Sequence, residues 1–228
     1  MLSECDFAVA DLLEAKGCKV MKDIIIVGAG HLGIDVYELL CSINDFSRKW
    51  NIKGFINDVP LDITRFRLPI GIIGSIANWQ PSSNEVFAMA IGSPCGKEQV
   101  AEKLKARGAI FETLISPKAS VARTAVIGEG AVVFMGSQIA PCATIGKFAC
   151  IGNSIIGMDA SIGDYSNTAA WVNVYQDVIV GKRCQLWSHS VILNKVGDDA
   201  IVGAGSVVIS KVRSGTKVFG NPAKKLDF

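Results

Sequence analysis

The chain has 228 residues, half of them hydrophobic, and a formal net charge of +2. This length can bury the core of one large domain or two modest ones. The nearly balanced charge gives no reason to expect nucleic acid or a membrane surface as a partner, and no apolar stretch approaches the roughly 18 residues of a membrane span.

Residues 1–20 contain several acidic side chains, including Glu4 and Asp6. A secretory signal would begin basic and continue apolar, so this stretch is not one. Because Met21 directly precedes the first strand pattern, we interpret residues 1–20 as an N-terminal extension or as an artefact of the choice of start codon. The seven cysteines are odd in number and form no CxxC pair. Without an export signal, this pattern indicates reduced thiols in a cytoplasmic protein.

The next segment has the pattern of a strand, a glycine turn and a helix. Residues 23–27 predict a buried strand and residues 34–43 a helix, with the sequence GAGHLG between them. Glycines at this spacing permit a tight turn and the close approach of a phosphate to the N–H groups that begin the helix. The residues expected to contact a nucleotide here are Gly28, Gly30, His31 and Gly33.

Two more strands, over residues 52–56 and 86–91, and a helix over residues 97–107 complete a Rossmann-like α/β domain spanning residues 21–112. Asp58 follows the second strand. An acidic side chain about 20 residues beyond such a glycine turn can hydrogen-bond a ribose or a base. A Rossmann-like domain whose glycine turn binds nothing remains an alternative.

The second half of the chain is a repeat. From Ile115 an aliphatic residue recurs every six positions to Ile151, again from Ile156 to Ile192, and again from Val196, with Thr168 as the exception. A small residue usually follows four positions later. A short strand and a turn every six residues wind into a β-solenoid, whereas an amphipathic helix would need a period of 3.6. We therefore expect a β-helix over residues 113–228.

The order of the motifs GAGHLG, AIGSP, LISPKASV, IVGAGSVV and VFGNPAKKL resembles the hexapeptide-repeat sugar O-/N-acyltransferases. This family includes sialic-acid O-acetyltransferases and the bacillosamine-pathway N-acetyltransferase. The resemblance implies a left-handed parallel β-helix, a homotrimer, and a nucleotide-linked sugar bound by the N-terminal domain. It also implies that acetyl-CoA lies in a groove between subunits. The sequence contains no spacing of metal-ligating residues, so no metal is expected. The residues implied to bind acetyl-CoA are Gly203, Ala204, Gly205, Ser206, Asn221, Pro222 and Lys224.

The chain departs from the family at its catalytic histidine. The expected position falls on Met158, or on Asp159 if the first change of phase is moved, and a second family histidine corresponds to Asn167. The chain has two histidines in all, His31 and His189. The γ-class carbonic anhydrases, which share the β-helix, bind their metal through three histidines, so that function is excluded.

The missing histidine favours an amine acceptor. An amine with a pKa near neutrality is partly unprotonated and needs no strong base, whereas a hydroxyl does. We therefore expect N-acylation of a nucleotide-linked amino sugar, with Asp159 as base and Asn167 nearby. The alternatives are O-acetylation of a sugar with His189 as base, and a catalytically degenerate protein that binds acyl-CoA and a nucleotide. Trp171, Tyr175 and Trp187 could stack on a ligand or fill the trimer interface.

Overall fold

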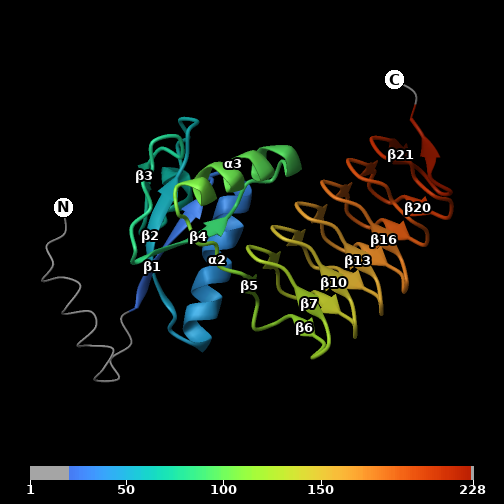
Figure 1. The fold of residues 1–228 in the computed structure, drawn as a ribbon, viewed down its shortest axis with the longest axis horizontal. Helices are drawn as coiled ribbons and strands as arrows, with labels where there is room; N and C mark the ends of the chain where they lie inside the picture. Colours follow the sequence, from blue (N-terminus) through green and yellow to red (C-terminus); the bar gives the residue numbers. More distant parts are fainter. Residues whose placement is uncertain (1–20, 227–228) are drawn as a thin grey trace, which may run out of the picture.

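The computed structural model describes residues 21–226, so the interpretation of residues 1–20 as an extension lies outside the described residues. Figure 1 shows a small α/β unit followed by a long β-helix. No helix within residues 21–226 is long and apolar enough to cross a membrane.

The α/β unit is built on a parallel sheet with the strand order β3-β2-β1-β4. Its elements are β1 (Lys22–Val27), α2 (His31–Phe46), β2 (Trp50–Ile56), η1 (Thr64–Phe66), β3 (Ile72–Gly74), β4 (Glu85–Met89) and α3 (Pro94–Ala106). Ile24 and Ile26 pack with α2, and Ile25 and Val27 pack with α3. Since alternate residues of a strand face opposite sides, the two helices cover the two faces of the sheet.

The strands and helices that the sequence predicted for the α/β unit are present, but they begin or end at other residues. The strand β3 was not expected, and α3 begins at Pro94 rather than at Lys97. The side chain of Ser93 caps α3 by accepting a hydrogen bond from the Gly96 N–H, and Pro94 follows at the first helical position. Both residues are typical of helix starts, so the helix begins one turn earlier than its apolar pattern suggested.

The β-helix has three faces of stacked parallel strands, which we call A, B and C. Face A contains β5 (Leu114–Ile115), β8 (Val132–Val133), β11 (Cys150–Ile151), β14 (Asn167–Thr168), β17 (Gln185–Leu186), β19 (Ile201–Val202), β21 (Lys217–Phe219) and the antiparallel β22 (Lys224–Lys225). Face B contains β6 (Ser120–Val121), β9 (Gln138–Ile139), β12 (Ile155–Ile156), β15 (Asn173–Val174), β18 (Val191–Ile192) and β20 (Val207–Val208). Face C contains β7 (Val126–Ile127), β10 (Thr144–Ile145), β13 (Ser161–Ile162) and β16 (Ile179–Val180).

The period of six is confirmed, since the repeating aliphatic residues from Val133 onward form one buried column inside the β-helix, with Val121 and Ile127 partly buried against it. Both changes of phase fall in turns. The turn of residues 152–154 is one residue short, yet Ile155 still pairs with Gln138 and Asn173. Thr168, the exception, also points inward and bonds the Ser154 hydroxyl at 3.0 Å. The parallel β-helix is therefore established, and its left-handed course stays a prediction.

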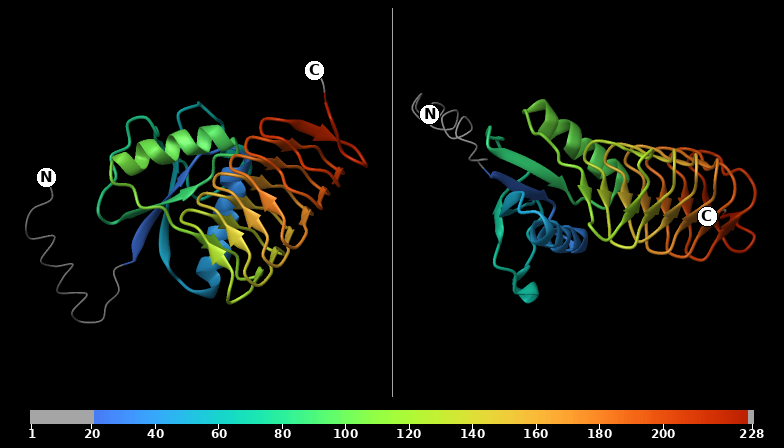
Figure 2. Two further views of the ribbon diagram at one scale, coloured as in Figure 1. Left: turned by 45° about the vertical axis from the view of Figure 1, so that its right-hand side comes forward. Right: turned by 90° about the horizontal axis from the view of Figure 1, so that it is seen from below.

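The α/β unit lies at the N-terminal end of the β-helix (Figure 2). Side chains of α3 contact residues of several coils at the corner between faces C and A. The Arg183 guanidinium lies 3.4 Å from the Glu98 carboxylate, the Tyr165 hydroxyl donates to Glu102 at 3.1 Å, and Lys105 donates to Glu129 at 2.6 Å. These contacts fix the sheet relative to the coils. That residues 21–112 and 113–228 form separate domains stays a prediction.

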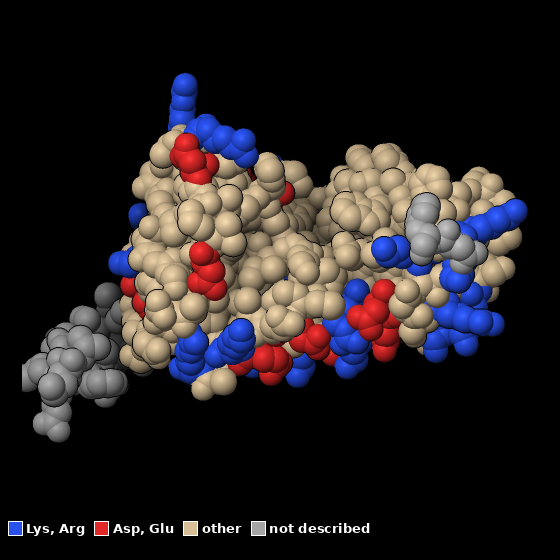
Figure 3. Space-filling model, turned by 90° about the horizontal axis from the view of Figure 1, so that it is seen from above, with Lys and Arg blue, Asp and Glu red and all other residues tan. Residues whose placement is uncertain are grey.

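The charge of the surface is unevenly distributed. In Figure 3, Lys, Arg, Asp and Glu gather in a row along one long edge, and most of the remaining visible face is uncharged. At the corner between faces C and A, successive coils place opposite charges together, as where Lys182 Nζ lies 3.1 Å from Asp164 Oδ2. Because such pairs neutralise each other, the corner between faces C and A presents no strong field of one sign.

Candidate functional site

The glycine turn has a shape that leaves room for a ligand. Gly28 has φ of 107°, and a Cβ there would lie 2.9 Å from the Ala90 carbonyl oxygen. A Cβ on Gly33 would collide with the carbonyl of Gly28, whereas one on Gly30 would meet no atom within 4 Å. Gly28 thus makes the turn, Gly33 lets the helix pack closely, and Gly30 leaves open surface.

Asn57 holds this turn from the neighbouring strand β2. Its Oδ1 accepts a hydrogen bond from the Ala29 N–H at 3.2 Å. Asp58, the residue expected to contact a ribose or base, accepts instead from the Ala77 N–H through Oδ1 at 2.9 Å. Its Oδ2 accepts no hydrogen bond from residues 21–226. Oδ1 of Asp58 therefore holds the loop that contains Ala77, and Oδ2 is free to accept a hydrogen bond from a ligand.

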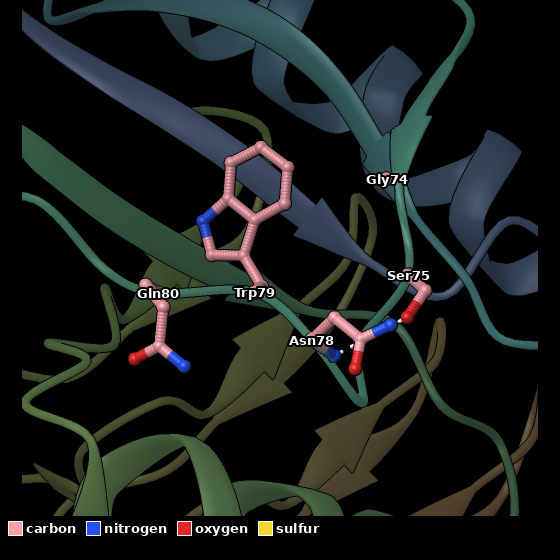
Figure 4. A pocket seen from close by; sticks show the side chains of 5 residues that line it. All are labelled: Gly74, Ser75, Asn78, Trp79 and Gln80. Atoms are coloured by element: carbon pink, nitrogen blue, oxygen red, sulfur yellow. Dashed lines mark hydrogen bonds between the residues drawn. The ribbon is translucent and has the colours of Figure 1, made fainter.

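The loop that Asp58 fastens lines a shallow pocket, shown in Figure 4. The lining residues are Gly74, Ser75, Asn78, Trp79 and Gln80. The Trp79 ring packs on Gly74, where a Cβ would meet it at 2.7 Å, and its Nε1 donates to Glu85 at 3.2 Å. The pocket combines an aromatic flank with amide side chains, which can stack on and hydrogen-bond a planar base.

A second group of side chains faces the start of α2. Arg65 Nη2 lies 3.3 Å from His31 Nε2, and the Arg65 guanidinium lies 4.6 Å from the centre of the Phe66 ring. The helix begins at His31 without a side-chain cap and has no acidic residue in its first turn. Its first N–H groups and the Arg65 charge both favour an anion. Sequence reasoning missed Arg65, because nothing in its local pattern links it to the glycine turn.

A separate pocket lies beside α2, where the helix meets the first coils. It measures about 500 Å³ including its open mouth. It is lined by Asp35, Glu38, Leu39 and Ser42 of α2 and by Ser116, Phe134 and Met135 of the β-helix. Asp35 and Glu38 follow His31 on the same helical face. Neither carboxylate forms an ion pair with another described residue.

The three expected catalytic residues lie on different parts of the β-helix perimeter. Asp159 is exposed at the corner between faces B and C, beside Met158, with φ of 56°. His189 is exposed at the corner between faces A and B, and Asn167 begins β14 on face A. One chain therefore does not bring Asp159, Asn167 and His189 together. Aspartate is also among the few residues that tolerate the left-handed turn conformation, which gives Asp159 a structural role as well.

Asn167 is engaged by α3. Its Oδ1 accepts from Lys97 Nζ at 2.6 Å, and its Nδ2 donates to the Gly92 carbonyl at 2.6 Å. Lys97 also donates to the Phe148 carbonyl at 2.9 Å and is 1% exposed. Burial lowers the pKa of Lys97 to about 8. The expected catalytic amide thus belongs to a network that begins at a buried lysine and ends at the exposed Gly92, and sequence reasoning missed the lysine.

The two segments expected to bind acetyl-CoA do lie together. Residues 203–206 form the turn between β19 and β20, and the Gly220 N–H donates to Ser206 Oγ at 3.1 Å. The Ala223 N–H donates to the Val207 carbonyl at 2.8 Å, so residues 221–224, including Asn221, Pro222 and the exposed Lys224, fold against this turn. The exposed Ala204 N–H donates to no other described residue.

Among residues 21–226 no three His, Cys, Asp or Glu side chains are grouped as a metal ion would require. No family model matches the sequence. The bifunctional protein GlmU of Gloeobacter violaceus is 27% identical over 108 residues, which are 43% of this chain and 24% of that protein. The chain therefore spans about a quarter of the length of this curated relative.

Solved structures match over almost the whole chain. A mutant of perosamine N-acetyltransferase from Caulobacter crescentus, in complex with CoA and GDP-perosamine, is 21% identical with a TM-score of 0.82, covering 92% of this chain and 99% of that one. WeeI from Acinetobacter baumannii is 24% identical with a TM-score of 0.79, covering 91% and 100%. The acetyltransferase domain of PglB from Neisseria gonorrhoeae, bound to acetyl coenzyme A, is 22% identical with a TM-score of 0.60, covering 91% and 100%. The chain shares the fold of these proteins.

Proposed function

We propose that this protein is an acetyl-CoA-dependent N-acyltransferase acting on a nucleotide-linked amino sugar. The observation that carries the proposal is the match, over 92% of this chain and 99% of the other, to perosamine N-acetyltransferase holding CoA and GDP-perosamine. A fold can host unrelated functions, so the argument also needs the sites. Two features support the proposal: the open surface at Gly30 and the exposed Ala204 N–H in the turn of residues 203–206, which has no partner among the described residues.

The acceptor would bind at the α/β unit, in the role of a Rossmann-like nucleotide domain. The diphosphate would meet the N–H groups near Gly30, with His31 and Arg65 beside it. The nucleoside would lie toward Asp58 and the pocket of residues 74–80. Ligands of open parallel sheets bind beyond the carboxyl ends of the strands, which is where these groups lie. The sugar could then extend along α2, where the carboxylates of Asp35 and Glu38 can accept hydrogen bonds from its hydroxyl groups.

The donor would lie along the β-helix. The free N–H of Ala204 could hydrogen-bond the pantetheine chain, and Lys224 could pair with the phosphates at the nucleotide end. Because Asp159 lies at the corner between faces B and C and the donor segment of residues 203–206 at the corner between faces A and B, a site that joins base and donor would need a groove between subunits. This requirement supports a homotrimer. We place the enzyme in the cytoplasm, where acetyl-CoA and nucleotide sugars are available.

The chemistry is the attack of the unprotonated amine on the thioester carbonyl. A C–N bond forms, the C–S bond breaks, and CoA leaves as a thiolate. The proton of the amine passes to the Asp159 carboxylate or to water and then to the thiolate. Backbone N–H groups of the turns would stabilise the oxyanion. Met158 at the expected histidine position leaves no strong base there, which is why an amine acceptor is favoured.

O-acetylation of a sugar is the second candidate. The observation that favours it is that His189 is exposed at the same corner as Ala204, one coil away, where the Gly205 N–H donates to the Ser188 carbonyl at 2.9 Å. An imidazole there could act as base for a hydroxyl. A catalytically degenerate protein that binds acyl-CoA and a nucleotide is the third.

The test is release of the CoA thiol from acetyl-CoA with a panel of UDP-, dTDP- and GDP-linked amino sugars and their hydroxyl counterparts. Turnover restricted to amino sugars supports N-acylation, and turnover with hydroxyl sugars supports the second candidate. Binding of acetyl-CoA and a nucleotide without turnover with any acceptor would favour the degenerate protein, and no binding of acetyl-CoA would contradict all three candidates.

A further inference from the structure

Lys97 is an unusual buried cation. Its side chain is 1% exposed, yet its amine forms no ion pair with any carboxylate among residues 21–226. Burying a charge costs free energy unless it is paired or hydrogen-bonded. Lys97 occupies the buried stripe of α3 with Ala101 and Leu104, where an apolar side chain would pack at lower cost. Such a group needs an explanation beyond stability.

The amine of Lys97 begins a chain of contacts that ends at the glycine turn. It donates to Asn167 Oδ1 at 2.6 Å, and Asn167 Nδ2 donates to the Gly92 carbonyl at 2.6 Å. Residues 90–92 leave the end of β4 directly beside Gly28. The Ala90 N–H donates to the Val27 carbonyl at 2.9 Å. The loop of residues 90–92 therefore forms one wall of the candidate nucleotide site and is tied to β14 through Asn167.

The charge of Lys97 decides which way the Asn167 amide points. An ammonium group donates and cannot accept, so it selects the oxygen of the amide and turns the NH₂ group toward Gly92. With the amide reversed, its oxygen would face the Gly92 carbonyl oxygen, and the two acceptors would repel each other. The charge of Lys97 thus orients Asn167 so that it donates to the Gly92 carbonyl, although Lys97 is not a partner in that hydrogen bond.

We propose that Lys97 is a positioning residue for the acceptor, which holds the loop of residues 90–92 at the glycine turn through the amide of Asn167. This inference rests on the proposed function, because it concerns the same nucleotide site. Neither residue touches the acyl donor segment of residues 203–206. The contribution of Lys97 is therefore specific to the nucleotide.

The network has a dependence on pH. Burial lowers the pKa of Lys97 to about 8, and the titratable group facing it is the thiol of Cys150 on β11, whose pKa is raised by its own burial. On α3 itself, Glu98 and Glu102 are engaged with Arg183 and Tyr165 at the corner of the β-helix. A neutral amine keeps two N–H donors but loses its charge, and hydrogen bonds from a charged donor are the stronger ones. Nucleotide binding should therefore weaken as pH rises through about 8.

The experiment measures the Kd of GDP, UDP and dTDP, and of acetyl-CoA, by calorimetry between pH 6.5 and 9.5. Lys97→Met keeps the length of the side chain and removes its donors, and Lys103→Met is the control on the exposed side of α3. We expect Lys97→Met to raise the Kd of the tightest nucleotide about tenfold at pH 7, since one charge-assisted hydrogen bond has about this value. The Kd of acetyl-CoA should change less than about twofold.

A second variant, Asn167→Asp, tests the proposal independently in case Lys97→Met does not fold. Asn167→Asp keeps a partner for Lys97 and raises its pKa, but removes the donor to Gly92. It should bind the nucleotide more weakly and lose the change in Kd near pH 8. Unchanged nucleotide binding in both variants, or equal weakening of nucleotide and acetyl-CoA, would overturn the positioning role. If the wild type binds none of the three nucleotides, the proposed function fails, and this inference with it.

Discussion

The rings of Trp171 and His189 stack on consecutive coils, with centroids 6.3 Å apart and planes inclined by 16°. Both residues have φ near 60°, at 63° and 62°, in the turn between faces A and B. The stack holds the His189 ring one coil below the turn of residues 203–206. The histidine available for O-acylation is thus ordered near the expected donor segment, at a different corner from Asp159.

Replacing His189 separates the two transfer reactions. If the acceptor is an amine and Asp159 or water takes its proton, His189→Ala should lower kcat less than about threefold, because His189 has no part in proton transfer. If the acceptor is a hydroxyl, kcat should fall by about 10²-fold or more, the usual contribution of a general base. Steady-state kinetics with acetyl-CoA and the preferred acceptor decide between them.

Asp159→Asn tests the proposed base. Asparagine tolerates the left-handed turn conformation, so the fold should survive. We expect kcat to fall about 10- to 100-fold, at the lower end of general-base effects because the amine is partly unprotonated already. Asp177→Asn is the matched control, since Asp177 is also exposed, with φ of 59°, at the same corner of the next coil. Equal kcat values for the two variants would remove Asp159 from the mechanism.

Two glycines of the same turn should respond differently to one methyl group. In Gly30→Ala the Cβ would meet no atom within 4 Å, so stability should hold while nucleotide affinity falls about tenfold through a clash with the ligand. In Gly28→Ala the positive φ and the contact with the Ala90 oxygen should lower stability as well. Thermal unfolding and nucleotide titration of both variants make the comparison. Tight binding by Gly30→Ala would show that no ligand approaches Gly30.

The wild type should gain stability relative to Lys97→Met in alkaline solution. Its folded pKa, about 8, lies below the ordinary 10.5, so the unfolded chain binds more protons between these values. The contribution of Lys97 to the free energy of unfolding therefore increases with pH in this window, by about 2 kcal/mol between pH 8 and 10. The buried thiols of Cys150 and Cys184, whose pKa values are raised, lower the stability of both proteins over the same range, so denaturant unfolding at both pH values should show the gain as the difference between the wild type and Lys97→Met. An equal gain in the two proteins would contradict the lowered pKa.

The sequence predicted what depends on repetition and missed what depends on tertiary contact. The period of six and its changes of phase predicted the β-helix, because every coil needs the same inward aliphatic residues and the same small residues at its turns. Ser93 and Pro94 carried a helix-start signal, and starting α3 there would have aligned Lys97 with Ala101 and Leu104 on one buried stripe. Arg65 and Asn57 carried no such signal, because their partners are set by the packing of the sheet.

The most direct measurement is the release of CoA thiol from acetyl-CoA in the presence of each nucleotide-linked amino sugar, beside the same nucleotide sugar with a hydroxyl in place of the amine. The proposed function predicts turnover with at least one amino sugar, the loss of that turnover when the amine is replaced, and an acetamido product by mass spectrometry. Turnover that prefers the hydroxyl sugar, or none with any acceptor, would contradict it.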